Sequence, residues 1–180
     1  GAGLAEHQGV AEAVAQQGLT ITTGSKALGG LGGIVTGPRA AIEAMVNTAR
    51  PLIYSTGVPA SLVAALDAAL DVIRDEPERR ARLHELIATV RGRVAAMGWR
   101  LPPSEAPTPI VPLVVGAEED ALRLAQHLEG RGICGIAIRP PTVPPGGARV
   151  RLALRCDLTD ADIDQLMQAL ADWPDGMTSA

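Results

Sequence analysis

The chain has 180 residues, 47% of them hydrophobic, so it can bury a core and is not a disordered tail. Its formal net charge of −4 disfavours a nucleic-acid or anionic-membrane surface, because such surfaces need clustered lysine and arginine. Aromatic residues make up 2% of the chain and Phe is absent, which argues against platforms that stack bases.

The cysteines and the hydropathy profile indicate the compartment. Cys134 and Cys156 have no cysteine or histidine at ligand spacing, so the sequence predicts neither a zinc site nor a disulfide framework, and no metal is expected. No stretch reaches the ~18 uncharged apolar residues of a membrane span, and no signal peptide is visible. We therefore expect a cytoplasmic protein with no membrane partner. Since the chain opens with G-A-G-L and no Met, we also expect this start to be a cut rather than a natural terminus.

Periodicity, glycine and proline predict short strands and several helices before residue 98. The strands cover 19–22 and 34–36, on either side of a segment, 22–33, that is too rich in glycine for a regular element. The helices cover 10–17, 38–50, a stretch ending at Arg74, and 77–98. Pro51 is expected to stop the second helix and Gly98 the last one.

The last third alternates strands and helices after a proline-rich connector, 101–109. The predicted strands are 110–115, 133–138 and 148–154, and the first helix between them is 118–129. A final helix runs to Ala171, capped by Thr159 with Asp162 three residues on. This order is typical of a small α/β sandwich with helices over one face of a sheet.

Lys26 is the first candidate for chemistry. It lies in T-T-G-S-K-A-L-G-G-L-G-G, with Thr23 and Ser25 before it and glycines after it. A lysine that forms a Schiff base must reach its carbonyl from a fixed backbone point and lose its proton, and nearby hydroxyls can hold a phosphate. Three other interpretations stay open: a solvated surface lysine, a glycine phosphate cradle, or glycines needed only for close backbone packing. The cradle matches neither G-x-G-x-x-G nor the Walker pattern.

This segment resembles the lysine segment of the α-oxoamine synthases, which are pyridoxal 5′-phosphate (PLP) enzymes of the aminotransferase-like fold. The resemblance implies that Lys26 holds PLP as a Schiff base and that Thr23 binds its phosphate. It covers the chain from about residue 19 to 173 and is most specific at the lysine segment and at I-R-P-P-T-V-P.

Arg139 begins the second constellation, R-P-P-T-V-P-P-G-G. Two prolines keep the backbone extended, so the guanidinium is presented from a stiff loop that suits bidentate capture of a carboxylate. A proline-rich connector with an incidental arginine is the alternative. The segment closely resembles that of the biotin-pathway branch of the family, which implies that Arg139 binds the amino-acid carboxylate and that Thr142 contacts substrate.

A third match is Tyr54-Ser55-Thr56. In the family this segment lies at the dimer interface and offers a hydroxyl to the partner subunit's cofactor phosphate, so Ser55 and Thr56 are predicted cofactor ligands in a homodimer. The alternative is a helix N-cap.

The remaining polar and aromatic residues are interpreted structurally. His127 is expected on a solvated helix flank, and Glu118-Glu119 as helix-start charges favoured by the dipole. Trp99 and Trp173 are expected to be packing anchors near helix ends.

The resemblance implies a PLP-dependent, aminotransferase-like α/β protein of fold type I. Residues 1–57 would be the end of the large domain, 58–98 linking helices, and 99–180 a small C-terminal α/β sandwich domain. The implied activity is that of a C-acyltransferase, the decarboxylative condensation of L-alanine with pimeloyl-CoA or a pimeloyl carrier-protein thioester. The alternatives are a sister synthase that uses glycine and another acyl-CoA, and a non-catalytic fragment or half-subunit.

Two departures from the family pattern qualify that implication. The segment 154–157, L-R-C-D, replaces a stretch of small residues and histidine. The family's aspartate at the pyridine nitrogen, its ring-stacking histidine and its first phosphate contacts would precede Gly1. We therefore expect a C-terminal half that is inactive alone.

Overall fold

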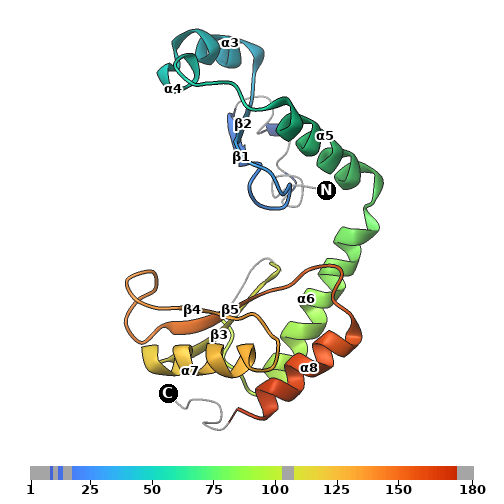
Figure 1. Cartoon of the computed structure of the whole chain (residues 1–180), viewed down its shortest axis with the longest axis vertical. Coiled ribbons are helices and arrows are strands. Elements are labelled where there is room, and N and C mark those ends of the chain that lie inside the picture. Colours follow the sequence, from blue (N-terminus) through green and yellow to red (C-terminus); the bar gives the residue numbers. More distant parts are fainter. Residues whose placement is uncertain (1–8, 10–11, 14–17, 103–107, 174–180) are drawn as a thin grey trace. The chain divides into compact units, whose positions relative to one another are not determined.

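The structure is a computed structural model that describes residues 9, 12–13, 18–102 and 108–173. The chain folds into two compact units, Gly1–Pro77 and Glu78–Ala180 (Figure 1). The helix predicted over 10–17 lies outside the described residues except at 12 and 13. The three-part division at 57/58 and 98/99 stays a prediction.

The first unit contains a β-hairpin followed by helices. Strands β1 (Thr20–Thr23) and β2 (Gly33–Thr36) pair antiparallel, with Thr23 opposite Gly33, so the glycine-rich segment is the loop of the hairpin. The helices are α3 (Arg39–Thr48), α4 (Arg50–Ile53) and α5 (Ala60–Asp75).

The prediction that Pro51 ends a helix at Arg50 is wrong. Helix α3 ends at Thr48, Ala49 has an extended ψ of 96°, and the short helix α4 begins at Arg50 with Pro51 in its first turn. A first-turn proline is tolerated because its missing N–H would have had no partner within the helix.

The second unit contains the α/β sandwich predicted for 99–180, together with helix α6, which precedes it. Its sheet has the order β3-β5-β4, with β5 in the centre and antiparallel to both neighbours. Its elements in chain order are α6 (Glu78–Ala96), β3 (Ile110–Gly116), α7 (Glu118–Glu129), β4 (Ile136–Ile138), β5 (Ala148–Ala153) and α8 (Asp160–Ala171).

Strand β4 is shorter than the predicted 133–138. Only Ile136–Ile138 pair with β5, opposite Arg151 to Arg149. Before this point the backbone belongs to the end of α7, because the Ile133 N–H donates to Leu128 O at 3.0 Å. Ile133 therefore still belongs to the C-terminal end of α7, and the strand begins only at Ile136.

The core lies in the second unit. Alternate residues of β3 and β5 are buried, including Val111, Leu113, Val150 and Leu152, so one face of the sheet is covered by helices. Each of α6, α7 and α8 contributes buried apolar residues to the same cluster. Trp99 and Trp173, 6% and 7% exposed, join it as the predicted packing anchors.

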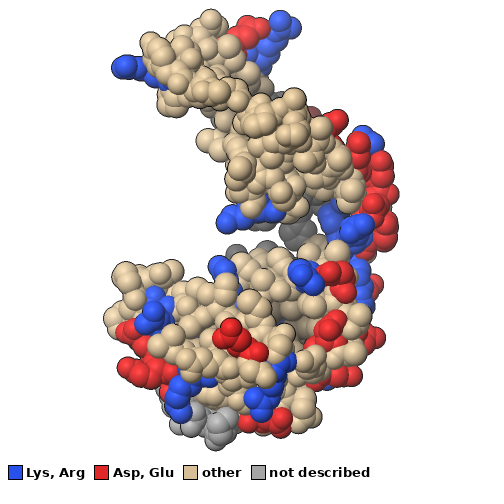
Figure 2. All heavy atoms as spheres, viewed as in Figure 1, with Lys and Arg blue, Asp and Glu red and all other residues tan. Residues whose placement is uncertain are grey.

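The first unit has no comparable core. All the buried apolar side chains of the described residues lie between Leu86 and Trp173. On the face drawn in Figure 2 the first unit is largely uncharged, whereas acidic and basic side chains are interspersed over the second. The large exposed apolar residues of the first unit are Leu19, Ile21, Leu31, Val35, Val46, Leu52, Ile53, Tyr54, Val58, Val63, Leu70 and Val72. Among the described helices none has the length and apolar character needed to cross a bilayer.

Candidate active site

Backbone hydrogen bonds hold the loop that carries Lys26. The Gly24 N–H donates to Gly32 O at 2.9 Å, and the Gly30 N–H donates to Gly24 O at 2.7 Å. Inside this ring the Gly29 N–H donates to Lys26 O at 3.0 Å, which makes a turn at the lysine. Lys26 itself is exposed. Its side chain therefore extends from a backbone point fixed by the loop's own bonds.

The glycines of this loop are required for two reasons. Gly29 and Gly32 have φ values of +66° and +98°, which side chains with a Cβ rarely adopt. Gly24 and Gly30 instead pack closely: an added Cβ would lie 2.9 Å from Leu31 O at Gly24 and 2.7 Å from Leu66 Cδ2 at Gly30. Close packing, one of the interpretations left open by the sequence, thus explains these two glycines.

Two hydroxyls lie beside the lysine turn. Thr23 Oγ1 and Ser25 Oγ are 2.7 Å apart, and the Ser25 N–H donates to Thr23 Oγ1 at 3.2 Å. Hydroxyls can both donate and accept, so the pair can turn its protons towards an anionic oxygen. The loop thus combines an exposed amine, two neighbouring hydroxyls and a backbone too tightly packed for side chains at Gly24 and Gly30. These features fit a phosphate-bearing aldehyde cofactor.

Lys26 is also distinguished by composition. Of the 16 basic residues counted as Lys plus Arg, 15 are arginine and Lys26 is the only lysine. A simple residue count could therefore have singled it out.

Ser55 and Thr56 follow α4. Ser55 closes the last turn of that helix, since its hydroxyl donates to Leu52 O at 2.8 Å. Helix α5 begins at Ala60 with Pro59 in the N-cap position and no side-chain cap, so the N-cap alternative for Ser55 and Thr56 is wrong. Both residues are exposed, as is the whole segment 51–60.

Arg139 comes directly after β4, in an exposed loop. The Thr142 N–H donates to Arg139 O at 3.0 Å, which closes a turn over the cis Pro140-Pro141 bond. Arg139 Nη1 lies 3.9 Å from Oε2 of Glu118, at the start of α7. The sequence interpretation of Glu118 as a dipole charge missed this ion pair, because it joins residues distant in the chain.

The structure thus groups the predicted residues in three places. Thr23 and Lys26 share the hairpin loop, Ser55 and Thr56 follow α4 in the same unit, and Arg139 shares a turn with Thr142 in the second unit. Within the described residues no group of three or more His, Cys, Asp or Glu is arranged to hold a metal ion.

His127 differs from its expected place on a solvated flank. It is half-buried, its Nε2 lies 2.8 Å from Ala169 O of α8, and its ring meets Trp173 edge-on at 5.1 Å. The histidine therefore joins α7 to α8, and its role is structural.

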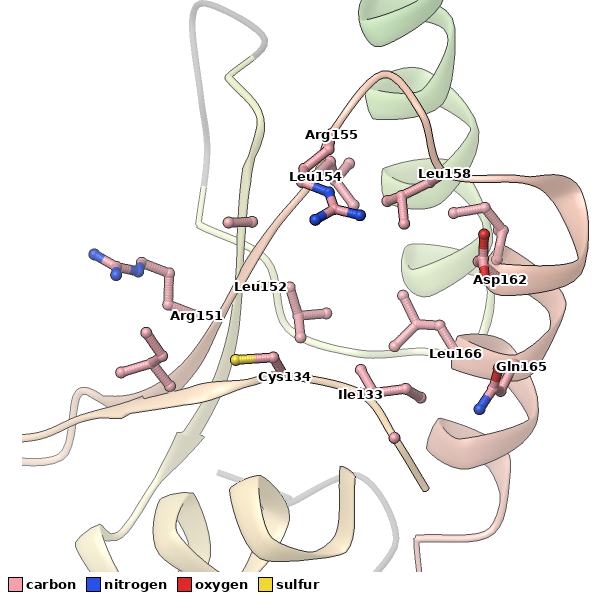
Figure 3. A pocket seen from close by; sticks show the side chains of 14 residues that line it. Ile133, Cys134, Arg151, Leu152, Leu154, Arg155, Leu158, Asp162, Gln165 and Leu166 are labelled. Atoms are coloured by element: carbon pink, nitrogen blue, oxygen red, sulfur yellow. The ribbon is translucent and has the colours of Figure 1, made fainter. Parts of the chain in front are cut away.

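A groove of about 410 Å³ opens in the second unit where the chain before β4 diverges from β5 (Figure 3). Leu152, Leu158 and Leu166 line it from β5 and from the α8 side, with Arg155 among its polar residues. None of the predicted site residues lines this groove. It is therefore no part of the lysine or arginine constellations.

Comparison with known proteins identifies the family. Residues 2–170 match aminotransferase class I and II. The chain belongs to this family. Its α-oxoamine synthase resemblance is confirmed by curated relatives 40–44% identical that are named 8-amino-7-oxononanoate synthase. The enzyme of Gluconacetobacter diazotrophicus, for example, is 44% identical over 86% of this chain and 38% of its own length.

Solved structures of the family confirm the fold. A structure of serine palmitoyltransferase with PLP matches with a TM-score of 0.84 and 28% identity, over 93% of this chain and 41% of that one. The 8-amino-7-oxononanoate synthase of Francisella tularensis matches with a TM-score of 0.73 and 28% identity, over 85% and 43%. The fold is the PLP-dependent fold type I predicted from the sequence. The chain spans about two fifths of the length of its curated relatives, 38% to 43% in the first three.

Proposed function

We propose that this chain carries the lysine and carboxylate-binding parts of an 8-amino-7-oxononanoate synthase site. The reaction joins L-alanine to pimeloyl-CoA, or to a pimeloyl carrier-protein thioester, and releases carbon dioxide and the thiol, as a step of biotin biosynthesis. The observation that carries the proposal is the hairpin loop, in which the only lysine of the chain stands on a backbone fixed by hydrogen bonds beside Thr23 and Ser25. The names of the curated relatives support the choice of reaction.

The cofactor of this proposal is PLP, which supplies an electron sink when bound. Lys26 would hold it through Nζ, and the Thr23 hydroxyl, 2.7 Å from Ser25 Oγ, would donate to its phosphate. During turnover Lys26 Nζ accepts the α-proton of alanine and later returns a proton. The fixed loop limits where Nζ can lie, which is what a positioned general base requires.

Arg139 binds the alanine carboxylate in this proposal. Its ion pair with Glu118 uses only Nη1, so the Nε and Nη2 donors are available for a bidentate contact. Thr142, which shares the turn, contacts the substrate. Both residues are exposed, so the substrate replaces water at the N–H groups of Arg139 and at the hydroxyl of Thr142.

A homodimer completes the proposal. Ser55 and Thr56 offer hydroxyls to the cofactor phosphate of the partner subunit. Both residues are exposed and therefore accessible to a partner subunit.

The test is borohydride reduction of the PLP-loaded protein, expressed from its own gene, followed by peptide mapping. The pyridoxyl group is expected on Lys26, and Lys26→Arg, which keeps the charge, should abolish the label and the PLP absorbance. These 180 residues hold no second lysine, so a label elsewhere would lie on an amine other than one of their lysine side chains. Such a label, or none, rejects the lysine assignment.

The choice of substrate needs a separate measurement. Alanine, glycine and serine are each offered with pimeloyl and longer acyl thioesters, and product is followed by mass spectrometry. Alanine dependence is expected. Glycine or serine dependence would favour a sister synthase, and absence of turnover in a protein labelled at Lys26 would favour the non-catalytic alternative.

A further inference from the structure

The first turn of α7 carries three acidic residues with different surroundings. Asp120 pairs with Arg123 of the same helix at 2.6 Å. Glu118 instead reaches out of the helix to Arg139, with Oε2 3.9 Å from Nη1. Glu119, between them, has no ion pair within the part of the chain that the structure describes. The helix dipole favours all three charges and does not account for their different partners.

The Glu118–Arg139 ion pair has the features of a weak contact that another carboxylate can replace. Only one guanidinium nitrogen takes part, at the long end of ion-pair distances, and the two side chains are 47% and 49% exposed. Exposed single-contact pairs are weak. A carboxylate that takes two parallel N–H donors binds the same guanidinium more strongly. A substrate carboxylate can therefore displace Glu118, and Glu118 occupies Arg139 when none is bound.

We propose that Glu118 is a positioning residue that competes with the amino-acid carboxylate for Arg139 and so sets the affinity for the amino acid. This inference rests on the proposed function, because it takes Arg139 as the carboxylate site. Glu118 holds the guanidinium in the empty site and is released when the substrate carboxylate binds. The exchange raises KM for the amino acid and leaves the chemical step unaffected.

The test is Glu118→Gln in the full protein with PLP. Removing the competing charge is expected to lower KM for the amino acid about two- to fivefold with kcat unchanged, since exposed pairs are worth little. The gain should shrink at high salt, which screens the wild-type pair. A loss of structure cannot produce tighter binding, so the direction of change separates competition from damage.

Glu119→Gln is the matched control. It removes the same charge from the same helix turn, one residue away, and should leave KM within error of wild type. An equal fall in both variants would show a general field effect and overturn the proposed contact. An unchanged or raised KM in Glu118→Gln would overturn it as well.

Arg139→Lys separates this inference from the proposed function. Lysine keeps the charge but loses the bidentate geometry, so KM for the amino acid should rise at least tenfold. If KM rises there but stays unchanged in Glu118→Gln, only the competition is rejected. If Arg139→Lys leaves KM unchanged, the carboxylate role of Arg139 fails and the inference fails with it.

Discussion

Gly135 offers a direct test of how tightly the second unit is packed. A Cβ at this position would lie 2.7 Å from Val150 Cγ1 and 3.1 Å from Leu128 Cδ1. Both neighbours are fully buried, and Val150 belongs to the central strand of the sheet, so neither can withdraw freely. Overpacking of this kind costs about 1–3 kcal/mol, and the reduced freedom of the unfolded chain returns about 0.4–1 kcal/mol. We expect Gly135→Ala to lower the free energy of unfolding by about 1–2 kcal/mol.

Urea unfolding followed by tryptophan fluorescence is the assay. Trp99 and Trp173 are the only tryptophans and both lie in this core, so their emission reports the second unit. With a slope of about 2 kcal/mol per molar urea, the midpoint should fall by about 0.5–1 M. Gly130→Ala is the control, because its Cβ would meet nothing closer than 3.5 Å, and its midpoint should stay or rise.

The packing argument is refuted if Gly135→Ala unfolds at the wild-type urea concentration. It is also refuted if adding Val150→Ala to Gly135→Ala costs as much as Val150→Ala alone, since shortening Val150 should relieve the clash.

Further predictions concern the helices of the same unit. Thr159→Ala removes the hydroxyl that accepts the Asp162 N–H and should cost about 1 kcal/mol in urea unfolding. Hydrogen bonds from Thr159 hold the pKa of Asp162 below its usual 3.8, so the stability from this carboxylate is complete above that value and lost as pH falls through the lowered pKa. Wild type and Thr159→Ala should therefore converge in urea midpoint on acidification, and parallel curves would contradict this linkage. His127→Ala removes the contacts with Ala169 O and the Trp173 ring, which should cost about 1–3 kcal/mol and shift tryptophan emission.

Elements with local signals were predictable from the sequence. Helix α7 has the predicted bounds Glu118–Glu129, because acidic residues mark its first turn and its buried residues Ala121, Leu124 and Leu128 follow the helical period. The capping box of α8 is confirmed, since Thr159 and Asp162 form its sequence pattern within one turn of the helix. In both cases the interactions that define the element lie inside it.

The sequence predictions were wrong where contacts between residues far apart in the chain determine the structure. The length of β4 depends on which residues pair with β5, and Ile133 is bonded to the end of α7 instead. The composition of residues 133–138 carries no information on either contact. His127 is half-buried because α8 and Trp173 reach it from more than 40 residues away. The ion pair of Glu118 with Arg139 likewise joins two turns that only the sheet brings together.

The candidate site divides in the same way. The resemblance supplied Lys26, Thr23, Arg139 and the other predicted residues, whose roles stay predictions. It did not supply the reason for Gly24 and Gly30, because their neighbour Leu66 lies in α5, more than 30 residues along the chain. The sequence could raise close packing as one interpretation, and the structure was needed to choose it for these positions.

The division of buried surface bears on how Lys26 is held. The second unit covers one face of its sheet with helices and so has a core of its own. The hairpin that carries Lys26 has only two strands, and such hairpins are marginal in water unless another layer covers them. Its glycines pack on Leu62 and Leu66, which are themselves only half-buried. The hydrogen bonds of the loop and its contacts with Leu62 and Leu66 therefore fix the local path of the backbone that carries Lys26.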